Sequence, residues 1–232
     1  MVQPAKEERV PGYRLDQTLT AVGRFRQSWN RYHRPDDVSH LLRLFRKVSL
    51  QRGYELDYLP MRRGDMRWIW PFARLSQPGS PTEPPPALRA IPPDRLAAEK
   101  RGGSLHMIEI ETLYRHLAYE HSAEGLAEYA FFLNELWATK APEREAAWLA
   151  IEPLVVRHAF DAVLRREAKN LVRVARPVAF DPLAILGEAG GTLSFLAFEA
   201  GPWKRIVRIE LTVEADGAVA WEPVEVVASL KG

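Results

Sequence analysis

The sequence predicts an α+β protein: an N-terminal module of two helices and a β-hairpin, a proline-rich linker, and a C-terminal helical bundle packed on a three-stranded antiparallel meander. Apolar residues recur at three- and four-residue steps in residues 13–52 and 105–170, which is helical spacing. They alternate with polar residues in residues 54–75 and 192–228, which is strand spacing. Seven prolines lie between residues 76 and 104, where neither pattern continues.

Composition places the chain among ordinary globular proteins, with 232 residues of which 47% are apolar. It contains no cysteine, which excludes disulfides, zinc–thiolate sites, iron–sulfur clusters and a thiol nucleophile. No run of about 18 apolar residues is present, and the amino terminus lacks an apolar signal segment. We therefore expect a cytoplasmic protein without a membrane partner.

Charge is distributed unevenly along the chain. Residues 1–75 hold 15 Lys/Arg against 8 Asp/Glu, whereas residues 105–232 hold 13 against 19. A basic module beside an acidic one indicates either that the basic face meets an anionic partner or that the two modules attract each other. Composition alone does not choose between them.

The N-terminal module begins after a polar, proline-flanked segment, residues 1–12, which we expect to be a disordered tail. An amphipathic helix follows over residues 13–33 and ends at a proline. A second helix is predicted over residues 36–52, with an aspartate cap at its start and Gly53 as a left-handed stop. One face of this second helix is a cationic stripe.

The predicted hairpin spans residues 54–75 and turns at Gly64 and Asp65. Trp68 and Trp70 share a strand face, so we expect them to pack beneath the helices, although they could stack on unpaired bases if exposed. The order of two helices and a basic hairpin resembles a winged-helix arrangement. That resemblance implies a helix in the DNA major groove and a hairpin tip near phosphate.

The cationic side chains of this module form the best-founded candidate site, because arginine and lysine neutralise phosphates. Its predicted nucleic-acid-binding residues are His40, Arg43, Arg46, Lys47, Arg62, Arg63 and Arg67. The same side chains would also suit an ordinary solvated surface, or a dock for the acidic C-terminal half of the chain.

The linker, residues 76–104, separates the basic module from an acidic α+β domain over residues 105–232. A helix is predicted over residues 105–121, with a short strand at 105–111 as the alternative. Further helices are expected to begin at Ser122, at Pro142 and after Pro153. Residues 171–180 are predicted to be extended, and the meander is predicted as strands 192–199, 203–213 and 218–228.

An enzymatic site finds weaker support. On a helix, His116 and Glu120 would share a face and could bind a divalent metal, with His158 and Asp161 completing the set if the helices met. A solvated polar face explains the same residues more simply. The chain has no Gly-x-Ser-x-Gly elbow and no phosphate-cradling loop, and residues 187–191 are typical of a turn. We expect neither a cofactor nor catalysis.

The leading hypothesis is a non-catalytic nucleic-acid-binding protein, or an accessory subunit of a nucleoprotein complex, whose acidic C-terminal domain meets a protein partner. The first alternative is a protein–protein adaptor with no nucleic-acid role. The second is a metal-dependent enzyme that uses the histidine and glutamate of residues 105–121.

Overall fold

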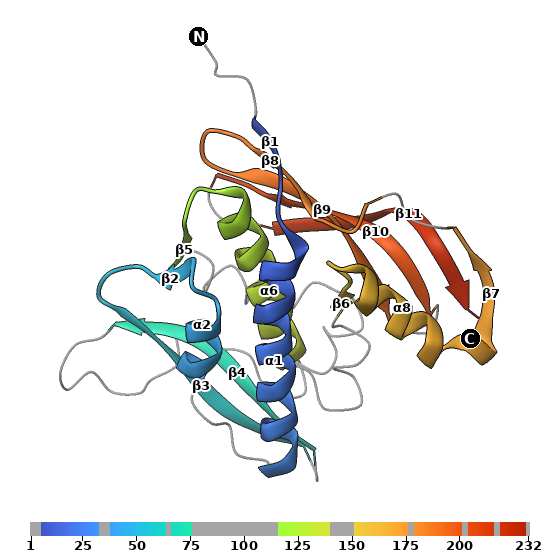
Figure 1. Ribbon diagram of the computed structural model, residues 1–232. Coiled ribbons are helices and arrows are strands. Elements are labelled where there is room, and N and C mark those ends of the chain that lie inside the picture. The colour runs from blue at the N-terminus through green and yellow to red at the C-terminus, as the bar shows by residue number, and fades with distance from the viewer. Residues whose placement is uncertain are drawn as a thin grey trace.

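The computed structural model describes residues 6–32, 38–63, 66–75, 116–139, 151–175, 179–200, 204–215 and 219–230 (Figure 1). Its helices are α1 (Gly12–Tyr32), α2 (Val38–Leu44), α6 (Ala123–Thr139), α8 (Arg157–Arg166) and the 3-10 turn η1 (Ala168–Asn170). Its strands are β1 (Lys6–Arg9), β2 (Val48–Leu50), β3 (Tyr54–Arg63), β4 (Met66–Leu75), β5 (Leu117–Tyr119), β6 (Ile151–Pro153), β7 (Leu171–Val174), β8 (Leu183–Leu186), β9 (Gly191–Glu199), β10 (Arg205–Val213) and β11 (Val219–Leu230).

A seven-stranded antiparallel sheet dominates the fold. Its order is β1-β8-β9-β10-β11-β7, and β6 pairs with β9 beyond the end of β8. The sheet is curled like half of a barrel, with α1 and α6 on its concave side (Figure 1). Strand β10 alternates as the sequence predicts, because Val207, Ile209 and Leu211 are buried whereas Arg208 and Glu210 are not.

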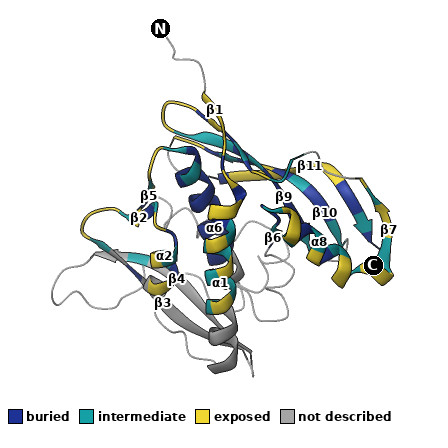
Figure 2. Ribbon diagram, viewed as in Figure 1, coloured by how far each residue is buried: buried dark blue, intermediate teal, exposed yellow. Residues whose placement is uncertain are grey.

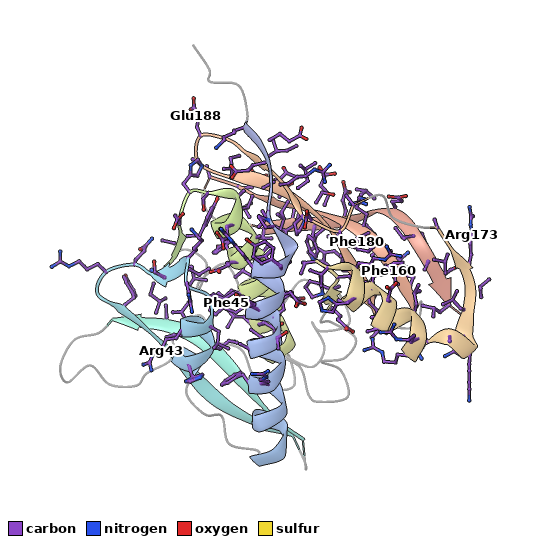
Figure 3. The ribbon with its side chains drawn as sticks, in the orientation of Figure 1. Arg43, Phe45, Phe160, Arg173, Phe180 and Glu188 are labelled. Carbon is purple, nitrogen blue, oxygen red and sulfur yellow. The ribbon has the colours of Figure 1, made fainter. Side chains whose placement is uncertain are left out.

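The main core lies between this sheet and α6, which is apolar around most of its circumference. Residues 125–136 of α6 are all buried (Figure 2), and Phe131 packs edge-on against Phe195 of β9 at a centroid distance of 5.1 Å. A second cluster covers the opposite face at one end of the sheet, where Phe160 of α8 lies against Phe180 in a T-shaped contact (Figure 3). The sheet is therefore packed on both faces.

The predicted fold class is wrong for the C-terminal part, which is not a helical bundle on a three-stranded meander. The three predicted strands exist as β9, β10 and β11, but they form the middle of a larger sheet. The additional strands are three or four residues long. Strand β7 lies within residues 171–180, which the sequence predicts as extended, and β8 pairs with β9 across a short turn. Strands β1 and β6 pair only with partners far away in sequence, as β1 does with β8. Periodicity within a short window cannot reveal such strands.

The N-terminal part also departs from its predicted form. Helix α2 ends at Leu44, not near residue 52, and β2 follows it and pairs with β5. Gly53 has a φ of 88°, the expected left-handed conformation, but it closes the turn between β2 and β3. The hairpin β3–β4 is present, with Arg63 paired to Met66 across a two-residue turn. The intervening strand removes the predicted winged-helix order.

Residues 6–9 form β1 at the edge of the sheet, where the sequence predicts a disordered tail. The linker, the strand or helix at residues 105–111 and the helix expected from Pro142 lie outside the described residues. Within the described ranges, no helix combines the length and apolar character needed to cross a membrane. The buried residues of α1, α2 and β2 join those of α6 and β9 in one continuous cluster.

Candidate nucleic-acid interface

Helix α2 presents cationic residues outward because its apolar residues are held against the core. Leu41 and Phe45 are each 1% exposed, and the Phe45 ring meets Phe132 of α6 edge-on at 5.4 Å. His40 and Arg43 occupy the exposed side. Figure 3 shows Arg43 extending from α2 away from α6, whereas Phe45 lies between the two helices. Packing of the apolar residues against the core thus determines that the basic residues face the solvent.

Lys47 lies in the turn after α2, and its ammonium group is directed back toward α6. Its Nζ is 2.7 Å from Glu120 Oε1 and 3.8 Å from Glu124 Oε2. The hydrogen bond to Glu120 raises the pKa of Lys47, and the same bond lowers the pKa of Glu120. Lys47 is therefore neutralised inside the chain.

Glu128 anchors the same turn from a buried position. The residue is only 4% exposed, and its Oε2 accepts a hydrogen bond from the backbone N–H of Lys47 at 2.7 Å. Burial raises the pKa of Glu128, and the neighbouring carboxylate of Glu124 raises it further. Arg14 of α1 meets Glu124 at 3.4 Å. The start of α6 is thus an acidic dock for one lysine and one arginine of the N-terminal part.

Three other arginines near α2 are not neutralised in this way. Arg43, Arg46 and Arg52 are exposed, and none of them has a carboxylate within ion-pair distance in the described part of the chain. Arg46 does lower the pKa of Glu128 through its charge, but this is a minor influence beside burial. These guanidinium groups are available to an anionic partner.

An aromatic stack lies next to these cations. The His40 ring is parallel to the Phe25 ring of α1, with centroids 5.6 Å apart and an interplanar angle of 11°. Phe25 is half-buried and packs against the core cluster, whereas His40 is exposed. The histidine ring therefore lies at the surface, parallel to a partly buried aromatic neighbour and offset from it.

The hairpin supplies the remaining predicted cations. Arg62 and Arg67 face each other across β3 and β4, and Arg63 is the last residue before the turn. The ribbon is a separate two-stranded sheet that α2 contacts through β3 and α6 contacts through β4 (Figure 1). The side chains of these arginines, and those of Trp68 and Trp70, lie outside the described residues.

No family model, curated protein or solved structure matches this chain significantly. Function is therefore inferred from the chemistry of the described side chains. The basic surface meant below consists of the exposed residues His40, Arg43, Arg46 and Arg52. The predicted contribution of Arg62, Arg63 and Arg67 stays a prediction, because their side chains lie outside the described residues.

The alternative metal ligands are not arranged as the sequence predicts. Residues 117–119 form β5, so the predicted helix is wrong there and the four-residue spacing does not place His116 and Glu120 on one helical face. The His116 ring instead stacks on Tyr54, with centroids 4.1 Å apart. Glu120 is bonded to Lys47, as described above.

The other two candidate ligands lie on α8, which Figure 1 shows well away from β5. His158 Nε2 is 3.5 Å from Asp16 Oδ2 of α1, and Asp161 pairs with Arg157 at 3.7 Å. Within the described ranges, no three His, Asp or Glu residues are grouped as metal ligands would be. The sequence predicts these residues on one helix or on touching helices, whereas residues 117–119 form β5 and pair with β2.

Proposed function

We propose that this protein binds nucleic acid without catalysis, through the basic surface around α2 and the β3–β4 hairpin. One observation carries the proposal: Arg43, Arg46 and Arg52 are exposed and have no carboxylate within ion-pair distance among the described residues. The glutamates at and before the start of α6 pair with Lys47 and Arg14 instead. The ion pairs between the N-terminal and C-terminal parts of the chain therefore leave Arg43, Arg46 and Arg52 without a carboxylate partner among the described residues.

The chemistry of the unused groups favours phosphate. Guanidinium presents several N–H donors in a planar fork, so that it can donate two parallel hydrogen bonds to phosphate oxygens. Several arginines close together release condensed counterions when they meet a nucleic acid, which makes binding strongly dependent on salt. A cytoplasmic location, which the sequence predicts, would give such a surface access to RNA.

Binding is tested by the fluorescence anisotropy of a labelled oligonucleotide titrated with the purified protein at several salt concentrations. We expect the logarithm of the affinity to fall linearly with the logarithm of salt concentration. The double variant Arg43→Glu/Arg52→Glu should weaken binding and flatten that slope. Arg173→Glu is the matched control, because Arg173 is an exposed arginine of β7 at the opposite end of the molecule (Figure 3).

Equal affinity of the double variant and the parent protein would refute the proposal, as would the absence of any salt-dependent binding. An acidic protein surface could use the same arginines, and this is the adaptor alternative. Capture of partners from a lysate with and without nuclease separates the two. A partner that survives nuclease treatment and is lost in Arg43→Glu/Arg52→Glu would favour the adaptor.

A further inference from the structure

We infer that the basic surface takes single-stranded nucleic acid, with His40 as a platform on which an unpaired base stacks. This inference rests on the proposed function and assigns its substrate class. It starts from the parallel stack of His40 on Phe25, whose ring planes differ by only 11°. Phe25 is half-buried and supports one side of the imidazole, which remains exposed. A planar group can extend this stack from the solvent side.

Exposed arginines flank both members of the stack in the sequence. Arg43 follows His40 by three residues on α2, so the two side chains share a helical face. Arg24 precedes Phe25 on α1 and is exposed. A base on the His40 ring would therefore have its phosphates near one or two guanidinium groups. Aromatic rings interleaved with cations are the usual means of holding single strands without sequence preference.

A duplex cannot use this platform. Its bases are stacked on one another, so that only the phosphate backbone and the base edges are accessible to a side chain. A duplex would contact Arg43 and its neighbours through its phosphates, but no base of the duplex would stack on His40. Stacking of one base contributes about 1–3 kcal/mol by alanine substitution, which corresponds to about 5- to 150-fold in affinity.

The test compares two variants that both lose the ionisable ring and differ in aromatic character. His40→Leu keeps an apolar side chain over Phe25, so that the contact between α1 and α2 is retained, but it offers no aromatic face. His40→Phe keeps that face. Each variant is titrated with one labelled oligonucleotide, alone and annealed to its complement, and circular dichroism verifies that both variants are folded.

We expect the parent protein to prefer the single strand. His40→Leu should lose about 5- to 150-fold in affinity for the single strand, His40→Phe should retain most of it, and duplex binding should stay unchanged in both. Equal losses in the two variants, or an unchanged affinity in His40→Leu, would overturn the platform while leaving phosphate binding intact. Failure of the parent protein to bind either form would instead refute the proposed function itself.

Discussion

The backbone N–H of Lys47 donates a hydrogen bond of 2.7 Å to Glu128 Oε2, and this bond joins the turn after α2 to the buried middle of α6. The position of α2 on the body of the protein depends on this contact and on the ring pair of Phe45 and Phe132. Because α2 carries Arg43, the buried carboxylate of Glu128 helps to position the proposed phosphate contact of Arg43.

Replacing Glu128 by alanine should destabilise the protein. The change leaves the partly buried Lys47 N–H without its acceptor, and losing the acceptor of a buried donor typically costs about 1–3 kcal/mol. Glu128→Gln keeps an oxygen acceptor at the same place and should lose less. Urea denaturation, monitored by tryptophan fluorescence, gives the free energy of unfolding of both variants. A Glu128→Gln protein that is less stable than Glu128→Ala would contradict this account.

The pH dependence of stability should distinguish Glu128 from Glu120. The folded pKa of Glu128 is raised by burial, so its contribution is most favourable at low pH and declines as pH rises through that raised pKa. The pKa of Glu120 is lowered by Lys47, so its contribution is present above the ordinary glutamate pKa and is lost as pH falls. The two carboxylates therefore act with opposite sign.

Denaturation curves between acid and neutral pH measure these signs. Relative to the parent protein, Glu128→Gln should become more stable as pH rises, whereas Glu120→Gln should become less stable. The charges that face Glu128 are those of Lys47, Arg46 and Glu124, and they are the same in both variants. If the stability of the two variants changed with pH in the same direction relative to the parent protein, the opposite pKa shifts assigned to Glu128 and Glu120 would be wrong.

Asn134 should be needed for the position of β6. Its amide donates to the Ile151 carbonyl at 3.0 Å and accepts from the Ile151 N–H at 3.2 Å, both in a buried setting. Asn134→Ala removes both bonds and should cost about 2–4 kcal/mol. Asn170→Ala is a control that loses one partly buried bond to Glu167, so its effect should be smaller than about 1 kcal/mol.

Two glycines of α1 should respond oppositely to substitution by alanine. A Cβ at Gly12 would lie 1.9 Å from the Val155 carbonyl oxygen, whereas a Cβ at Gly23 would meet nothing within 4 Å. Gly12→Ala should therefore destabilise by at least about 1–3 kcal/mol, because a backbone atom must move. Gly23→Ala should stabilise by about 0.5–1 kcal/mol through helix propensity. Thermal unfolding compares the two.

Lys47 should contribute less than Arg43 to nucleic-acid binding, although both are cations of the same region. Lys47 is paired with Glu120 and Glu124, whereas Arg43 has no carboxylate partner among the described residues. Lys47→Gln should change the salt slope of binding less than Arg43→Gln does. Anisotropy titrations measure both slopes, and the reverse order would mean that the ion pair opens when nucleic acid binds.

The sequence predicts those parts of the fold whose pattern is local. Alternation in β10 and continuous apolar character in α6 both correspond to the observed burial. Pairing between distant segments was missed: Val48 of β2 faces Tyr119 of β5, and neither three-residue strand has a period long enough to be recognised. The helix predicted through His116 failed for this reason.

For the candidate site, too, the sequence predicts what depends on local spacing and misses what depends on contacts between distant segments. That Arg43 is exposed follows from the four-residue spacing of two buried residues, Leu41 on α2 and Phe45 directly after it. That Lys47 is neutralised depends on where α6 docks, and no local pattern contains that information. Glutamates 128 and 135 within an apolar helix were the available signal, since a buried carboxylate requires a partner.

The first turn of α1 depends on a residue that is made much later. The Gly12 N–H donates to Asp181 Oδ1 at 2.8 Å, across a separation of 169 residues. At a synthesis rate of about 5–20 residues per second, roughly ten to thirty seconds pass on the ribosome between these two positions. Throughout that interval β1 and the start of α1 lack their native partners, so this part of the chain can complete its structure only after residues 181–186 have been made.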